Sequence, residues 1–288
     1  MKIKNLHKLP GQVVRAVEKG CWAPKAGRYS ASMLTKSPRA HWLAVRHWDD
    51  LEKDVSEMLW SLMGSSFHSV LEKGQGENDL TEERLSVQLD LPTGPVKFSG
   101  VCDLYTDGNV YDWKTGSAWT AIYMDQAKIM EWESQLNAYA FLYHLAGFPV
   151  KSLNIVLFMR DWQNSKARRE ANYPRLPMEL YQVHLWPFED TERYIRQCIT
   201  SLEKHRDTPD DELPVCSPEY RWAKKDTWAV KKSGNIRARK VCDSEVEAES
   251  ILKAGEEIEY RQGDQFVRCR DYCDASEFCS FYKELNYE

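Results

Sequence analysis

Two aspartates and one lysine lie close together in the segment GVCDLYTDGNVYDWKTG, residues 100–116. Asp103 and Asp112 fall on two strands that this pattern predicts to form a hairpin. Lys114 follows Asp112 by two residues, so its side chain emerges on the same face of the strand. Carboxylates hold divalent ions, and a nearby cation can orient water and offset charge on a phosphate. The set suits hydrolysis of a phosphodiester, although an exposed hairpin also carries acids and lysines by chance.

Further motifs surround this segment: G-x-x-x-H before it, G-x-x-D and D-x-K-T-G within it, and Q-x-x-x-Y after it. The motif residues are Gly64 and His68, Gly100 and Asp103, Asp112, Lys114, Thr115 and Gly116, and Gln135 and Tyr139. Their types and their order resemble the motif series of RecB-type nucleases, a branch of the PD-(D/E)XK superfamily. The resemblance covers roughly residues 30–205. It implies an α/β fold of the restriction-endonuclease type, with a mixed central sheet flanked by helices.

The resemblance also implies which residues bind the catalytic Mg²⁺ or Mn²⁺. These are Asp103, Asp112 and the backbone carbonyl of Trp113, with His68 as a further ligand. Taken without the other motifs, a histidine near the start of a helix is more simply interpreted as structural. Glu72 lies one helical turn after His68 and could join the site, but a salt bridge within the helix explains it more simply.

The remaining motif residues would support the reaction. Lys114 would position or activate the attacking water, and Gln135 and Tyr139, one helical turn apart, would face the same site. The set implies a deoxyribonuclease, and an exonuclease is favoured over a sequence-specific endonuclease because no segment resembles a base-reading module. The implied setting is phage or bacterial recombination, repair or end processing of DNA. A single-strand annealing protein or a helicase would be a fitting partner.

Two other functions fit some of the same residues. The chain could be a nuclease-fold DNA-binding or adaptor protein without catalysis, although the complete set of Asp103, Asp112 and Lys114 argues against this. It could also be a structural or regulatory protein stapled by a cysteine-bound metal, in which the acids are only surface charges. Metal-dependent degradation of DNA would separate the three functions.

The periodicity of apolar residues predicts the elements that carry these motifs. Residues 30–73 read as largely helical, and Gly64 as a break or a close approach. Alternation then predicts a three-stranded antiparallel meander, with a turn at Asp107-Gly108-Asn109. The ranges are 82–91, 96–105 and 108–116 for the meander, 124–148 for a long helix, 151–162 and 181–188 for two strands, and 190–205 for a last core helix.

A Pro- and Asp-rich linker over 206–218 indicates the end of the first domain. We therefore predict a core over 1–207 with an N-terminal helical region, and a small αβ appendage over 208–288. The appendage should contain a hairpin over 228–241, a helix over 243–255 capped by Asp243 or Ser244, and a strand over 257–262.

Three of the eight cysteines form a C-x3-C-x5-C series, Cys269, Cys273 and Cys279. This trio resembles that of relatives with an iron–sulfur cluster, although the first gap is longer by one residue. Such a site needs a fourth ligand, and Cys216 in a Pro-flanked loop is preferred over Cys242 and Cys21. A [4Fe–4S] cluster or Zn²⁺ would fit four thiolates. Against a cluster of the usual kind, Ser37 stands where those relatives carry a cysteine before Pro-Arg, and free thiols packed among aromatic residues are the simpler alternative.

The hairpin of the appendage is rich in cations with Trp228 among them, which suits contact with a phosphate backbone. Its candidate DNA-binding residues are Lys231, Lys232, Arg237 and Arg239, and Arg39 of the Pro-Arg pair is added to this set. The alternative is a solvated hairpin whose lysines protect an edge strand. Both interpretations remain open.

The composition fits a globular chain, with 42% apolar and 29% charged residues. No apolar run of about 18 residues occurs and the N-terminal segment lacks the apolar stretch of a secretion signal, so we expect a cytoplasmic protein without membrane contact, in a bacterial host if phage-encoded. The net charge of −5 does not itself indicate nucleic-acid binding. An acidic protein can still carry a basic groove, so the local charge decides.

Overall fold

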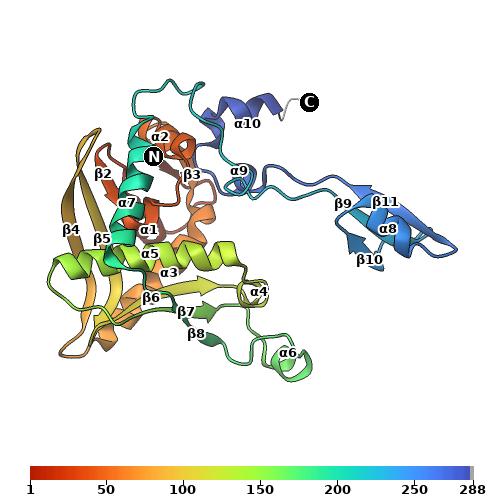
Figure 1. Ribbon diagram of the computed structural model, residues 1–288, viewed down its shortest axis with the longest axis horizontal. Coiled ribbons are helices and arrows are strands. Elements are labelled where there is room, and N and C mark those ends of the chain that lie inside the picture. Colours follow the sequence, from red (N-terminus) through yellow and green to blue (C-terminus); the bar gives the residue numbers. More distant parts are fainter. Residues whose placement is uncertain (286–288) are drawn as a thin grey trace. The chain divides into compact units, whose positions relative to one another are not determined.

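The computed structural model describes residues 1–285, whose helices and strands belong to two units (Figure 1). Unit 1 consists of Met1–Lys36 and Trp48–Asp207. Unit 2 consists of Ser37–His47 and the chain from Thr208 onward. The predicted division after residue 207 differs in one respect, because the segment Ser37–His47 packs with unit 2 rather than with the sequence around it.

Unit 1 is built on a mixed sheet, which confirms the predicted α/β class. The strands in spatial order are β2 (Arg28–Ser30), β5 (Gly94–Thr106), β6 (Asn109–Gly116), β7 (Ser152–Met159) and β8 (Met178–Val183), and β4 (Leu80–Leu91) also pairs with β5. β2 lies parallel to β5, and β6 lies parallel to β7. The other pairings are antiparallel.

The predicted meander is present as β4, β5 and β6. Leu89, Val96 and Phe98 alternate toward the core, as the sequence pattern requires. Asp107 and Gly108 have φ angles of 50° and 87° between β5 and β6. Positive φ at both positions allows a tight turn whose twist matches that of the two strands. The turn therefore fixes the register on which the site depends.

Two helices cover one side of this sheet. α5 (Gln126–Leu145) connects the parallel strands β6 and β7 and packs across the sheet (Figure 1), and α7 (Phe188–Glu203) packs against α5. The Asp125 carboxylate caps α5 by accepting a hydrogen bond from Lys128 N. Leu136, Phe98 and Ile155 are fully buried between the helices and the sheet. Short helices α4 (Ala118–Ile122) and α6 (Asn164–Arg169) lie in the connections.

The region predicted as largely helical is more divided. It contains η1 (Ala31–Met33), α2 (Pro38–Arg46), β3 (Glu52–Asp54), η2 (Val55–Met58), α3 (Leu59–Leu71) and η3 (Glu72–Gly74). β3 pairs in parallel with β1 (Lys2–Lys4), which precedes α1 (Gly11–Lys19). Around Asp54 the prediction of a largely helical region is wrong, because the Asp54 carboxylate accepts hydrogen bonds from Ser56 N and Leu6 N and turns the chain there.

Unit 2 has two small cores. In the first, Trp42 and Leu43 of α2 pack with Leu213, Ala275 and Cys279, near α9 (Val267–Asp271), η4 (Ser276–Phe278) and α10 (Ser280–Leu285). The second lies under the sheet β10–β9–β11, formed by β9 (Thr227–Lys232), β10 (Lys240–Cys242) and β11 (Glu256–Arg261), with α8 (Glu245–Ile251). The predicted hairpin, strand and Ser244-capped helix are confirmed. Within residues 1–285, no helix is both long and apolar enough to cross a membrane.

Candidate metal centre

The two predicted aspartates come from adjacent strands. The last β5–β6 pair in register is Leu104 with Tyr111, so Asp103 and Asp112 follow at the next position on each strand. Both are buried, with 7% and 2% of their surface exposed. Asp103 Oδ2 accepts a hydrogen bond of 2.6 Å from Trp113 N. The amide of Trp113 thus helps to orient Asp103, while metal binding by its carbonyl stays a prediction.

Lys114, Gln135 and Tyr139 form a connected set beside Asp112. Lys114 Nζ lies 2.5 Å from Asp112 Oδ2 and donates to Gln135 Oε1 at 3.0 Å. Gln135 Nε2 in turn donates to Tyr139 OH at 2.7 Å and to Asp112 Oδ1 at 3.4 Å. The alternation of β6 and the helical turn of α5 therefore bring all four predicted side chains to one place, as the motif spacing indicated.

Gly100 allows α5 to approach the sheet this closely. A Cβ atom at Gly100 would lie 2.8 Å from Cδ1 of Tyr139 and 2.9 Å from Cδ1 of Leu142. Gly64 is different, because it lies inside α3 and a Cβ there would meet no atom within 4 Å. The prediction that Gly64 marks a break or a close approach is therefore wrong.

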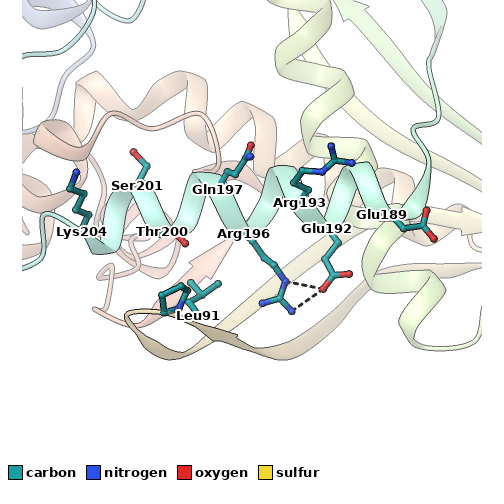
Figure 2. A pocket seen from close by; sticks show the side chains of 10 residues that line it. Leu91, Glu189, Glu192, Arg193, Arg196, Gln197, Thr200, Ser201 and Lys204 are labelled. Carbon is teal, nitrogen blue, oxygen red and sulfur yellow. Dashed lines mark hydrogen bonds and ion pairs between the residues drawn. The ribbon is translucent and has the colours of Figure 1, made fainter.

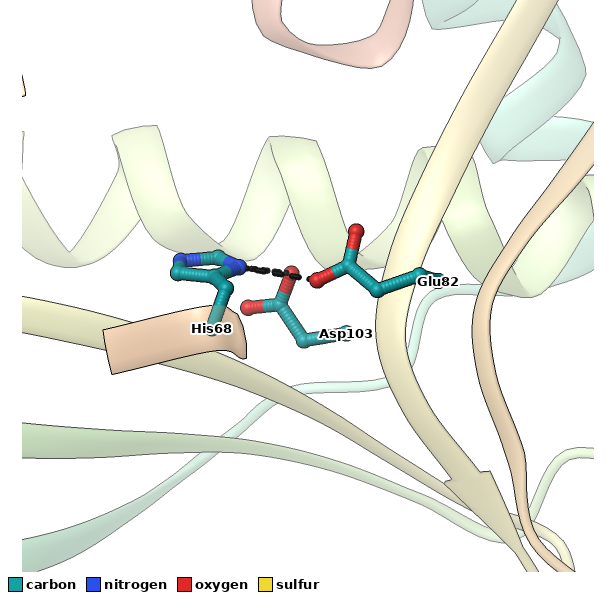
Figure 3. A group of neighbouring side chains, drawn as sticks. All are labelled: His68, Glu82 and Asp103. Atoms are coloured by element: carbon teal, nitrogen blue, oxygen red, sulfur yellow. Dashed lines mark hydrogen bonds and ion pairs between the residues drawn. The ribbon is translucent and has the colours of Figure 1, made fainter. Parts of the chain in front are cut away.

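His68, on α3, lies next to Asp103 (Figure 3). Its Nδ1 lies 3.2 Å from Asp103 Oδ1 and 2.9 Å from Glu82 Oε1. Among residues 1–285, these three side chains are the one group of three or more whose potential ligand atoms all lie within 4.8 Å of one another. A site of one histidine and two acids suits a divalent metal ion.

The sequence reasoning missed Glu82, although a signal for it exists. In the β4–β5 ladder Thr81 pairs with Leu104 and Glu83 with Cys102, which leaves Glu82 opposite Asp103. Glu82 does not form a ladder pair and has a φ of 53°, a left-handed conformation that is rare for glutamate. Extending the predicted register back from the turn would have placed Glu82 beside Asp103.

The charges at the site favour a bound cation. The hydrogen bonds of Asp103 and Glu82 raise the pKa of His68 to about 10. Burial raises the pKa of Asp112, although Lys114 opposes this shift. Asp112 Oδ2 is buried and, among the described residues, contacts Lys114 without the geometry of a hydrogen bond. A divalent ion would replace the proton that these acids favour on His68, and it would give the buried Asp112 oxygen a partner.

The space around these ligands is small, and most of the residues that line it are polar. A cavity of about 50 Å³ is lined by His68, Glu82 and Asp103, together with Trp113 and Leu71. Glu72, which the sequence offered as a weaker candidate, also lines it and is exposed. A larger hollow of about 800 Å³ follows α7, where Arg196 pairs with Glu192 (Figure 2), but none of its lining residues belongs to the motif series.

The four predicted cysteines of unit 2 line one cavity of about 20 Å³. Burial raises the pKa of Cys269 to about 11, and the nearby charges of Cys273, Cys216 and Cys279 add to the shift. Ser37 stands beside them and hydrogen-bonds the Cys216 thiol. The other two candidates lie elsewhere: Cys242 is buried with Val230 and Ala248, and Cys21 donates to Val17 O.

Arg39 does not fit its predicted place in the DNA-binding set. Only 3% of its surface is exposed. Its Nε donates to Leu213 O and its Nη2 to Asp211 O, both at 3.0 Å, and its Nη1 approaches Cys279 Sγ and Ser280 Oγ. Arg39 therefore holds together two segments of unit 2, and its guanidinium is not free to contact DNA.

The basic hairpin is partly neutralised by the strand beside it. Lys231 Nζ lies 2.5 Å from Glu259, and Arg239 Nε lies 2.6 Å from Glu256. Both acids belong to β11, which pairs with β9. Lys232 and Arg237 are exposed and form no ion pair in the part of the chain that the structure describes. The alternative of a solvated hairpin thus gains support, while DNA binding by the remaining cations stays a prediction.

Comparison with known proteins gives matches only among solved structures. No protein-family model matches the chain, and no curated protein does. The crystal structure of a protein named SSO0001 is similar, with a TM-score of 0.48 and 15% identity over 68% of this chain and 86% of that one. An alkaline exonuclease from Laribacter hongkongensis, LHK-Exo, gives a TM-score of 0.35 at 14% identity, covering 63% and 90% of the two chains. Its complex with dAMP gives 0.36 at 15% identity with the same coverage.

Proposed function

We propose that this chain is a metal-dependent deoxyribonuclease. The observation that carries the proposal is the convergence of an acidic pair, a histidine and a lysine from separate elements onto one place. His68, Asp103 and Asp112 are joined there by Lys114, whose amine is held by Gln135. Neither a surface hairpin nor a purely structural metal site calls for a lysine fixed against a buried carboxylate.

The residues present fit Mg²⁺ or Mn²⁺, which prefer oxygen ligands. Asp103, His68 and Glu82, whose potential ligand atoms already lie within 4.8 Å of one another, would hold the ion. Asp112, which lies outside that group, and the carbonyl of Trp113 would complete its surroundings. Such an ion would lower the pKa of a bound water molecule and would offset the negative charge of the phosphate.

The other side chains would act on the substrate and the water. The Lys114 ammonium would orient the attacking water and contact a phosphate oxygen. Gln135 accepts from Lys114 and donates to Tyr139 and Asp112, so it holds the amine at a fixed distance from the carboxylate. Gln135 and Tyr139 are thus positioning residues.

Substitution of Asp112 tests the proposal. Asp112→Asn keeps the size of the side chain but removes its charge, so cleavage of DNA in Mg²⁺ or Mn²⁺ should fall by more than about a hundredfold, as expected for loss of a metal ligand. Lys114→Ala should give a comparable loss. The matched control is Asp90→Asn, an exposed aspartate of β4, which should cleave like the unaltered chain. Wild-type protein without metal-dependent cleavage would overturn the proposal and favour the silent DNA-binding alternative.

We also propose that the enzyme acts from DNA ends, in recombination, repair or end processing. This mode is favoured because the described residues include no helix or ribbon resembling a base-reading module. A time course on DNA labelled at either end, in single- and double-stranded form, measures it. Mononucleotide release from linear DNA with no cutting of a closed circle is the expected result, and cutting of the circle would contradict it.

We further propose that Cys216, Cys269, Cys273 and Cys279 hold a metal centre in unit 2. In favour of it, the four thiols line one cavity, and the charges of neighbouring cysteines contribute to the raised pKa of Cys216, Cys269 and Cys273. Zn–S bonds of about 2.3 Å place tetrahedral thiolates about 3.8 Å apart. Within residues 1–285, no three of these sulfurs lie within 4.8 Å of one another, and both a [4Fe–4S] cluster and Zn²⁺ stay candidates for the centre.

Metal analysis of anaerobically purified protein tests the cysteine proposal. Iron with absorbance in the visible range, or zinc without it, distinguishes the two metals. Cys273→Ser should lose the metal, whereas Cys21→Ser, a substitution in unit 1, should keep it. A chain that holds neither metal would show that the thiols only pack together.

A further inference from the structure

A second cavity lies beside the metal centre on another side of the sheet. It has a volume of about 300 Å³ and is mostly apolar. Trp60, Met63 and Phe67 line it from α3, Thr115 from β6, and Phe158 and Arg160 from β7 and its end. We call it the aromatic slot. Its size falls at the lower end of the range for small-ligand pockets.

The chain places this slot next to the reacting groups. Phe67 precedes His68, and Thr115 follows Lys114. Since side chains alternate along a strand and Lys114 points to Gln135 of α5, Thr115 points to the other face. Arg160 N donates to Gly116 O at 3.0 Å, which fixes the end of β7 two residues from Lys114. If the ligand in the slot is one unit of a chain molecule, the next unit of that molecule would therefore lie at the metal centre.

The walls of the slot are aromatic and open to solvent. α3 is rich in apolar residues, yet no side chain of this helix is buried, and Trp60 and Phe67 are 55% and 36% exposed. The Phe67 and Phe158 rings lie with centroids 5.3 Å apart, and Phe158 also contacts the Trp113 ring edge-on. Contiguous exposed apolar patches mark interaction surfaces and ligand-binding grooves.

Arg160 gives the slot a positive charge. Its guanidinium carbon lies 4.0 Å from the centre of the Trp60 ring, in cation–π contact. Among the described residues, no carboxylate forms an ion pair with Arg160. An unpaired cation stacked on an indole at the rim of an apolar cavity complements a ligand that has both a flat apolar part and an anionic part.

We propose that the aromatic slot binds one unpaired nucleobase of the DNA substrate, with Arg160 on the adjoining phosphate. The proposal rests on the proposed function and specifies its substrate as a strand with at least one base out of the duplex. A paired base cannot enter, because its faces are already stacked and its edge is bonded to the partner strand. An apolar peptide or a lipid tail could contact the aromatic walls, but it would leave the positive charge of Arg160 without an anionic partner.

The neighbouring helix α4 offers a continuation of the same surface. Trp119 and Tyr123 stack with their centroids 5.3 Å apart at an angle of 12°, and they are 55% and 70% exposed. Ala118 N, at the start of α4, donates to Asp161 Oδ1, which anchors this pair beside Arg160. A second base could stack on these rings as the strand leaves the slot.

The test separates base binding from phosphate binding and from cleavage. In the full-length chain carrying Asp112→Asn, so that DNA is not degraded, affinity is measured for a single-stranded oligonucleotide and for the same strand without bases. We expect the normal strand to bind about tenfold more tightly, from stacking of one base. Trp60→Ala should reduce this preference, and Trp60→Ala combined with Trp119→Ala should abolish it. Trp22→Ala, the same change at an exposed tryptophan of unit 1 outside the slot, should leave it unchanged.

A second variant guards against misfolding of the first. Arg160→Ala should weaken binding of both strands equally and lower the slope of affinity against salt by about one unit. Equal binding of the two strands by the unsubstituted slot, or a preference that Trp60→Ala leaves unchanged, would overturn the proposal. Cleavage by the wild-type chain is measured separately. DNA cleavage without a Trp60-dependent preference contradicts only the slot, and a preference without cleavage contradicts only the proposed nuclease.

Discussion

At the candidate metal centre, Glu82 is the side chain whose position the alternation of β4 does not reveal. Its φ of 53° takes it out of the β4–β5 ladder and brings Oε1 to 2.9 Å from His68 Nδ1. A non-glycine residue in this region of φ is held there at a cost, and such residues gather at functional sites. The backbone at Glu82 is therefore consistent with a role in metal binding rather than in strand pairing.

We predict that Glu82→Gln lowers the affinity for Mg²⁺ by at least about tenfold, since one anionic ligand is lost. The measurement is the Mg²⁺ concentration that gives half-maximal DNA cleavage. Glu83→Gln is the matched control, because Glu83 is exposed, stands next in the chain and keeps its ladder pair with Cys102. Equal Mg²⁺ requirements for the two variants would exclude Glu82 from the site.

At the scale of elements, the contact of α5 with β5 depends on one glycine. An added Cβ at Gly100 would come within 2.9 Å of both Tyr139 and Leu142, and Tyr139 is only 5% exposed, so neither the ring nor the helix can move freely. The motif glycine is thus a spacing device between a strand that carries Asp103 and a helix that carries Gln135.

We predict that Gly100→Ala destabilises unit 1 by about 1–3 kcal/mol through overpacking and also reduces cleavage. Gly64→Ala, in the other glycine motif, should be neutral or stabilising by up to about 1 kcal/mol, because alanine favours a helix and meets no atom there. Thermal unfolding of both variants compares them. Similar melting temperatures would show that the sheet adjusts to the methyl group.

Asp54 links β3 to the N-terminal segment and makes this link sensitive to pH. The hydroxyl of Ser56 and the amides of Leu6 and Ser56 lower the pKa of Asp54 to about 2. Because the folded pKa lies below the unfolded value of about 3.9, the stabilisation is fully present above pH 4 and is lost as the pH falls toward 2. Wild type should therefore melt above Asp54→Asn at pH 5, and the difference should shrink at pH 2 to 3. A constant difference would contradict this.

The elements that sequence reasoning predicted correctly are those with local signals. The meander follows from alternation and from Asp107-Gly108, and α5 follows from its helical spacing. The division near Asp54 could not be read locally, because it depends on a bond to Leu6 N, 48 positions away.

The candidate site shows the same contrast. The motif side chains lie together as predicted, because the periods of a strand and of a helix determine which side chains share one face of each element. Glu82 was within reach of register counting. The burial of Arg39 was not, because its acceptors Asp211 and Leu213 are more than 170 residues away in sequence. The neutralised hairpin was missed because Lys231 and Arg239 were considered without the acids of the neighbouring strand β11.

At the scale of the whole molecule, the two units are interleaved in sequence. α2 belongs to unit 2, although unit 1 continues on both sides of it. Trp42 and Leu43 of α2 are 2% and 1% exposed, and they pack with residues beyond the predicted boundary, including Leu213 and Ala275. The boundary at 207 is therefore not a simple place to cut the chain.

We predict that a chain ending at Asp207 exposes Trp42 and Leu43, which loses about 1.5–3 kcal/mol of burial for each side chain. It should bind an apolar dye and aggregate on size-exclusion chromatography. The same truncation with Trp42→Ser and Leu43→Ser should stay monodisperse, because the exposed apolar face is removed. A monodisperse truncation that retains both apolar side chains and binds no dye would mean that α2 finds other partners.

The interleaving also sets an order of assembly on the ribosome. α2 is synthesised before strands β4 to β8 of the unit 1 sheet, but Leu213, Ala275 and Cys279, which cover its apolar face, emerge only after that sheet is complete. Domains generally fold as units during synthesis, so we expect unit 1 to form first in the nascent chain while Trp42 is still exposed to solvent. During this interval the helix is open to chaperones and proteases. If Cys279 binds the proposed metal centre, the metal can be inserted only late, after unit 1 has folded.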